Sequence, residues 1–143
     1  CIRMRGKVGS KMPLLRPLPN FALSEFQHPE LIEQDAANFL QEVRTQFGEA
    51  LTVTDDARRP DERPSGAARG VSWHQRGRAF DLRCRDWSWR KLWRFVEAAF
   101  VVAASWQGRA TVELELVWSA TDKHVHLAVK NDGTPTELIL ALD

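Results

Sequence analysis

Two short stretches of this chain contain three of its four histidines, and their spacing suits a metal site. Residues 72–81 (SWHQRGRAFD) place His74 seven positions before Asp81, with a glycine and an alanine between them. Residues 124–126 (HVH) place His124 and His126 two positions apart, which on a β-strand directs both imidazoles to one face. Two imidazole nitrogens and one carboxylate oxygen would leave a zinc ion with one open position, as in catalytic rather than structural zinc sites. The sequence therefore predicts a catalytic metal centre.

Length and composition predict one globular domain without a membrane span. The 143 residues are 43% hydrophobic and 27% charged, which is ordinary for a soluble protein. No apolar run approaches the roughly 20 residues that cross a bilayer. The net charge of +1 gives no general attraction to nucleic acid, and no nucleic-acid motif accompanies the basic, tryptophan-containing residues 76–94. We expect a monomer that binds no nucleic acid.

The N-terminal residues 1–20 differ from the rest of the chain. They are basic, contain three prolines and show no hydrophobic periodicity. We interpret them as an arm that precedes a single domain over residues 21–143. The two cysteines, Cys1 and Cys84, cannot form a CxxC metal pair and imply no disulfide framework, which favours a reducing compartment.

Hydrophobic periodicity predicts two helices. Apolar residues recur at steps of three and four from Ile32 to Phe47, with Pro29 suited to the helix start and Gly48 to its end. A second helix should begin after Asp86 or Ser88, either of which can cap it. Its apolar stripe would contain Trp89, Leu92, Trp93, Val96, Ala99 and Phe100.

Alternating apolar residues predict two strands, 111–118 and 124–129, joined by a turn at 119–122. In this hairpin the apolar faces coincide, because Leu116 opposes Val125 and Leu114 opposes Leu127. We therefore expect an α+β fold, with an antiparallel sheet and helices packed on one face. Shorter strands are expected at 51–54, 79–82 and 137–142, and a long loop at 55–73. The open face of the hairpin would carry His124, His126, Glu113, Glu115 and Val117.

Four segments resemble a known family. The pattern over residues 72–81 resembles the SxHxxGxAxD signature of zinc D-alanyl-D-alanine peptidases and related endolysin peptidases. Residues 53–60 (VTDDARRP) resemble their VTSGYRSP segment, and residues 21–26 (FALSEF) their FSLSEF opening. Residues 124–130 (HVHLAVK) are similar to the HxH strand of the hedgehog signalling domain and of murein endopeptidases, which share that fold. The resemblance covers roughly residues 20–130, with its elements in the family's order.

The resemblance implies a hedgehog-like or DD-peptidase-like form of the α+β fold, with zinc bound by His74, Asp81 and His126. It implies that Arg58 holds a substrate carboxylate and that the Ser72 hydroxyl contacts substrate. The activity implied is that of a zinc metallopeptidase, a carboxypeptidase or endopeptidase that degrades the cell wall by cleaving peptidoglycan stem peptides or cross-links. Because family members encoded by phages serve as endolysins, we expect cytoplasmic synthesis followed by action on the wall.

The sequence departs from the family pattern at the catalytic base. Many of these peptidases place an acid three residues before the last metal histidine, where this chain has Lys123; the hedgehog-like position of the acid falls on Ala120. The candidate replacements are Asp122 and His124, followed by Glu115. Two hypotheses follow: a peptidase that uses one of these groups as its proton carrier, or a non-catalytic zinc-containing module that binds a partner or builds a virion.

Overall fold

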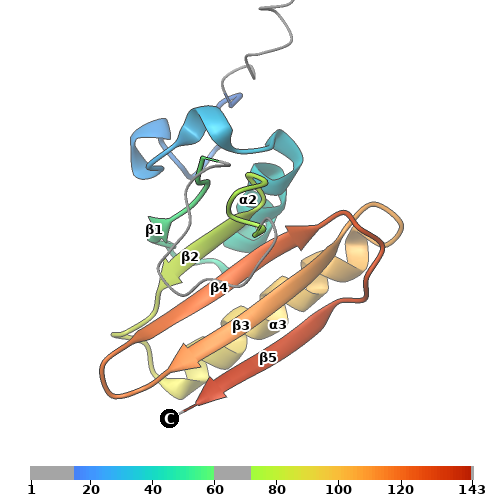
Figure 1. The fold of residues 1–143 in the computed structure, drawn as a ribbon. Helices are drawn as coiled ribbons and strands as arrows, with labels where there is room; N and C mark the ends of the chain where they lie inside the picture. The colour runs from blue at the N-terminus through green and yellow to red at the C-terminus, as the bar shows by residue number, and fades with distance from the viewer. Residues whose placement is uncertain (1–14, 60–71, 143) are drawn as a thin grey trace, which may run out of the picture.

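The computed structural model describes residues 15–59 and 72–142, which form two α-helices and a five-stranded sheet. The sheet faces the viewer in Figure 1, and one of the helices lies behind it. In chain order the elements are η2 (Leu23–Glu25), η3 (Pro29–Leu31), α2 (Gln34–Phe47), β1 (Val53–Asp55), β2 (Ala79–Arg83), α3 (Trp89–Ser105), β3 (Thr111–Trp118), β4 (Lys123–Lys130) and β5 (Glu137–Leu142). The predicted α+β class, both helices and the five strand segments are confirmed, with ends that differ by a few residues.

The strand order in the sheet is β1-β2-β4-β3-β5. β1 pairs with β2, β2 with β4 and β4 with β3, all antiparallel. The prediction of a wholly antiparallel sheet is wrong for β5, which runs parallel to β3, so the sheet is mixed. The physical reason is the connection at residues 131–136, which leaves the end of β4 and reaches the outer edge of β3. β5 therefore runs in the direction opposite to β4, and so in the same direction as β3.

The central hairpin has the predicted register. Leu116 pairs with Val125 and Leu114 with Leu127, so the apolar side chains of β3 and β4 are buried on one face. The turn is closed by the amide of Ser119, which donates to the carbonyl of Asp122 at 2.8 Å. The opposite face of these strands carries the histidines and glutamates.

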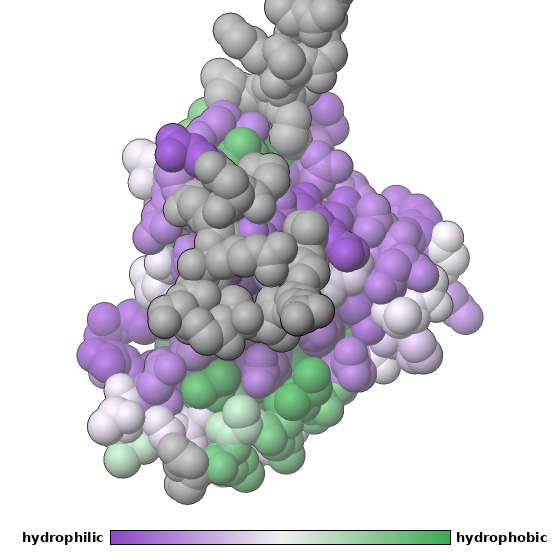
Figure 2. Space-filling model, in the orientation of Figure 1, coloured by the Kyte–Doolittle hydropathy of each residue, from purple (hydrophilic) through white to green (hydrophobic). Residues whose placement is uncertain are grey.

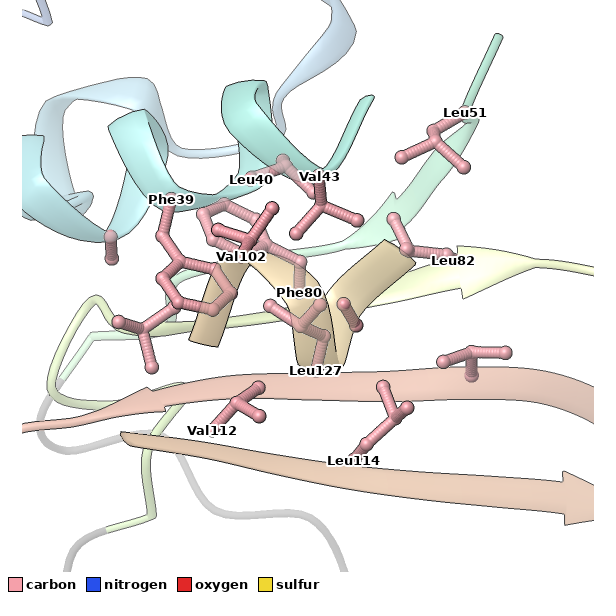
Figure 3. Close-up of a cluster of buried hydrophobic side chains, with 14 of the residues drawn as sticks. Phe39, Leu40, Val43, Leu51, Phe80, Leu82, Val102, Val112, Leu114 and Leu127 are labelled. Atoms are coloured by element: carbon pink, nitrogen blue, oxygen red, sulfur yellow. The ribbon is translucent and has the colours of Figure 1, made fainter. Parts of the chain in front are cut away.

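The apolar face of the sheet packs against both helices (Figure 3). Gly48, at a φ of 82°, ends α2, and the Oγ of Ser88 caps α3 by accepting from the amide of Lys91 at 3.1 Å. Ser88, rather than Asp86, is therefore the cap. The buried side chains that join the layers include Phe39, Leu40 and Val43 of α2, Phe80 and Leu82 of β2, Val102 of α3, Val112 and Leu114 of β3, and Leu127 of β4.

Two residues of the predicted α3 stripe lie outside the core. Trp89 and Trp93 are 50% and 44% exposed, so their assignment to the buried stripe is wrong. The helix buries a narrower face that includes Leu92, Phe95, Val96, Ala99 and Val102. Trp89 instead stacks on Trp118, with ring centroids 4.8 Å apart.

Residues 15–20, which the sequence analysis assigned to the arm, contact α2. Leu15 is 5% exposed, and the amides of Arg16 and Asn20 donate to the side chains of Gln34 and Gln41. The remainder of the predicted arm, residues 1–14, and most of the predicted loop over 55–73 lie outside the described residues.

The surface outside the core is mixed in character. Figure 2 shows polar side chains over most of one face and a hydrophobic area toward its lower end. Large exposed apolar side chains are found on β5, namely Ile139, Leu140 and Leu142. No helix among residues 15–59 and 72–142 is both long enough and apolar enough to cross a bilayer.

Candidate metal centre

The structure brings His74, Asp81 and His126 together on the open face of the sheet. The Oδ1 of Asp81 lies 3.3 Å from the Nε2 of His74 and 3.2 Å from the Nδ1 of His126. Each residue offers one ligand atom, and these atoms all lie within 4.8 Å of one another. Tetrahedral zinc with bonds of about 2.0–2.2 Å needs ligand atoms about 3.3–3.6 Å apart. The group is therefore close to the size that such an ion requires.

Strand pairing fixes two of these three residues. Asp81 of β2 and His126 of β4 are direct partners in the antiparallel ladder, so their side chains emerge side by side on one face. His74 comes from the turn that precedes β2, with a ring centroid 5.1 Å from that of His126. Its position therefore depends on how this turn is held.

Gly77 allows the turn to approach the N-terminal helical segment. Its φ is +73°, and a Cβ built at this position would lie 2.1 Å from the backbone oxygen of Leu31. The carbonyl of Gly77 accepts from the amide of Glu33 at 2.9 Å. Because any side chain would collide with main-chain atoms, only glycine fits here.

Arg78 connects the same turn to α2 and to β4 by hydrogen bonds. Its guanidinium is buried and donates from Nη1 and Nη2 to both carboxylate oxygens of Asp35, at 2.7 and 2.8 Å. Its Nε donates to the carbonyl of Val129 at 2.7 Å, and the amide of Val129 donates back to the carbonyl of Arg78. The chain that leads from His74 into β2 is thus bonded to both neighbouring elements.

The ring of His74 is oriented by Asp56. The Nδ1 of His74 lies 2.6 Å from the backbone carbonyl of Asp56, and since a carbonyl only accepts, Nδ1 carries the proton. The Asp56 carboxylate is 0% exposed and accepts from the amides of Gln27, His28 and Ala57 at 2.7–2.9 Å. The segment is therefore rigid, and the Nε2 of a neutral His74 presents its lone pair to Asp81.

The second histidine is held by Glu113. The Oε2 of Glu113 lies 3.5 Å from the Nε2 of His126, on the side of the ring away from Asp81. The sequence predicts both glutamates on this face, with Glu115, the direct ladder partner of His126, as the third candidate proton carrier. The carboxylate that reaches the ring belongs instead to the diagonal neighbour, as sheet twist allows. Metal-binding histidines commonly donate their second nitrogen to a carboxylate or carbonyl, and both histidines here have such an acceptor.

The charges of the group support one another. Burial lowers the pKa of the His74 imidazole, but the hydrogen bond and charge of Asp81 outweigh this and raise the pKa above its usual value. Burial also raises the pKa of the Asp81 carboxyl, yet the hydrogen bonds to His126 and His74 outweigh it and hold that pKa well below its usual range. A lone pair and a carboxylate 3.3 Å apart need a positive charge between them, either a proton or a metal ion. The donor set therefore fits a divalent cation.

The two predicted proton carriers contact each other and not the three-residue group. The Nδ1 of His124 lies 2.9 Å from the Oδ1 of Asp122, whose side chain is well exposed. Both residues, together with Asp81, line a hollow of about 300 Å³ beside the candidate metal centre. They are thus adjacent to the centre without being part of it.

The two predicted substrate-binding residues lie on the chain segments around His74. The amide of Arg58 donates to the carbonyl of His74 at 2.9 Å, and its guanidinium pairs with Asp55 at 2.7 Å. The charge of Arg58 is near enough to oppose protonation of His74. Ser72 is exposed, and its Oγ accepts from the amide of Gln75 at 3.2 Å.

Comparisons with models of protein families, with curated proteins and with solved structures found no match to this chain.

Proposed function

We propose that this chain is a zinc-dependent peptidase that cleaves peptide bonds in peptidoglycan stem peptides or cross-links. The observation that carries the proposal is the group of His74, Asp81 and His126, in which the second ring nitrogen of each histidine also faces a protein oxygen, at 2.6 Å for His74 and 3.5 Å for His126. Two nitrogens and one oxygen are a donor set suited to zinc, and three protein ligands are typical of catalytic zinc. Zinc held there would supply an acidic bound water and a Lewis acid for the scissile carbonyl.

The residues around the centre support hydrolysis of an amide. His124 would accept a proton from the attacking water and later deliver it to the leaving amine, while Asp122 orients the ring through Nδ1. Arg58 would hold a substrate carboxylate by charge-assisted hydrogen bonds, and Asp55 keeps its guanidinium in place.

A non-catalytic zinc-containing module is the second candidate. The observation that favours it is the absence of an acid at Lys123 and Ala120, together with the engagement of Glu113 by His126. Such a module would keep the metal for stability and use its surface to bind a partner.

Zinc-loaded protein tested on purified cell walls separates these candidates. The peptidase should reduce turbidity and release stem-peptide fragments, and His74→Ala or a chelator should abolish the release. His28→Ala is the matched control, because that side chain pairs with Glu30 outside the group. Stoichiometric zinc without any fragment release would eliminate the peptidase and leave the binding module.

A further inference from the structure

Two arginines line the hollow beside the candidate metal centre. The hollow of about 300 Å³ is lined by Thr54, Asp81, Arg83, Arg85, Asp122, Lys123 and His124, and the ammonium group of Lys123 lies over the Trp118 ring at 4.6 Å. We call Arg83 and Arg85 the basic wall. The volume suffices for a side chain of a bound peptide.

Strand geometry places Arg83 of the basic wall at a defined distance from the candidate ligand Asp81. Arg83 follows Asp81 by two positions on β2, so both side chains share the open face, and its ladder partner on β4 is His124. Two residues along a strand span about 6.5–7 Å. When the scissile bond of a substrate lies at the metal centre, the next residue of the peptide would therefore lie near the basic wall.

The carboxylates nearby are already engaged. Asp81 is bonded to both site histidines, and Asp122 is bonded to His124. Arg83 pairs with Asp86 at 2.8 Å, but both side chains are exposed, and ion pairs of this kind contribute little and exchange readily. The exposed guanidinium groups of Arg83 and Arg85 can therefore turn to an incoming anion, and a metal ion would offset the negative charge of Asp81.

We infer that the basic wall selects a substrate that carries a carboxylate on the residue beside the cleaved bond. This specificity rests on the proposed function, and it names an acidic peptide rather than a neutral one as the substrate class. Guanidinium groups bind carboxylates through paired hydrogen bonds, which suits Arg83 and Arg85 to this role.

Two synthetic stem peptides that differ only in this group, a free carboxylate or its amide, test the inference. The zinc-loaded protein should cleave the acid form with a kcat/KM about 10-fold or more above that of the amide form, since a hydrogen bond to a charged group has that magnitude. Arg83→Gln combined with Arg85→Gln should remove the preference. Arg90→Gln, an exposed arginine of α3 outside the hollow, is the control and should retain it.

Binding of uncleavable analogues separates this inference from the proposed function. Calorimetry would use reduced-amide versions of both peptides with the zinc-loaded protein. Tighter binding of the acid analogue that is lost in the double variant, without cleavage of either peptide, upholds the basic wall and eliminates the peptidase. Equal binding of the two analogues, or a preference that the double variant retains, overturns the inference whether or not cleavage occurs.

Discussion

The Nδ1 of His74 donates a hydrogen bond of 2.6 Å to the backbone carbonyl of Asp56, so a neutral His74 has its lone pair on the nitrogen that faces Asp81. The same Asp56 anchors its own position, since its buried carboxylate accepts from three amides. Asp56, which is not one of the three candidate ligands, thereby sets the orientation of His74, which is one.

Asp56→Asn should weaken both the fold and the metal site. The side-chain NH₂ of the asparagine would face a backbone N–H, so two donors would meet without an acceptor. A buried donor without an acceptor costs about 1–3 kcal/mol. We expect a lower free energy of unfolding in urea and zinc binding weakened about 10-fold, measured by competition with a chelator. Asp132→Asn is the control, because its carboxylate accepts hydrogen bonds from Thr134 in an exposed turn. Equal effects in the two variants would refute a special role for Asp56.

Glu113 and Glu115 should differ in their effect on metal affinity. Glu113→Gln removes the negative charge 3.5 Å from the Nε2 of His126, and loss of such a partner costs about 10- to 100-fold in affinity. Glu115→Gln alters the direct ladder partner of His126 and should leave zinc binding nearly unchanged. Isothermal titration with zinc measures both. A larger loss for Glu115→Gln would show that the direct partner orients the ring.

Gly77→Ala should destabilise the protein far more than a matched glycine substitution. Both Gly77 and Gly108 have positive φ, but only Gly77 would bring a Cβ against a backbone oxygen, and Gly108 has nothing within 4 Å. We expect Gly108→Ala to cost about 1 kcal/mol and Gly77→Ala roughly 3 kcal/mol or more. Chemical denaturation followed by circular dichroism gives both values. Similar costs would mean that the turn can move away from Leu31.

The ion pair of Asp35 with Arg78 should contribute stability that depends on pH. The hydrogen bond from Arg78 lowers the pKa of the Asp35 carboxyl below its ordinary 3.8, even though burial acts in the opposite direction. A lowered native pKa adds stability that is fully present above the unfolded value and is lost as pH falls through the native value. The difference in unfolding free energy between the protein and Asp35→Asn should be constant above about pH 5 and shrink below about pH 4. A difference that stays constant down to pH 3 would contradict this linkage.

The alternation of apolar residues was enough to predict the central hairpin, because a one-residue slip of Leu114 against Leu127 would expose the whole face. The direction of β5 could not be predicted, since alternation is the same for parallel and antiparallel strands. Periodicity also could not show that Trp89 stays half exposed at the start of α3, against Trp118 at the end of β3.

Residue types and spacing predicted a metal site, and the family resemblance selected His126 rather than His124, but neither predicted the groups that orient the two histidines. The contact of Glu113 with His126 depends on sheet twist, which selects the diagonal neighbour. The contact of Asp56 with His74 uses a backbone carbonyl, which any residue type supplies. Residue identity predicts the ligands of a site better than the groups that orient them.

Asp81 and His126 are 45 positions apart, and the whole of α3 and β3 lies between them in the chain. In a denatured chain the ligands are therefore scattered, and they meet only after β2 has paired with β4 in the middle of the sheet. An ion bound here cannot nucleate folding. Because its ligands are together only in the native state, such an ion would bind that state alone and slow unfolding.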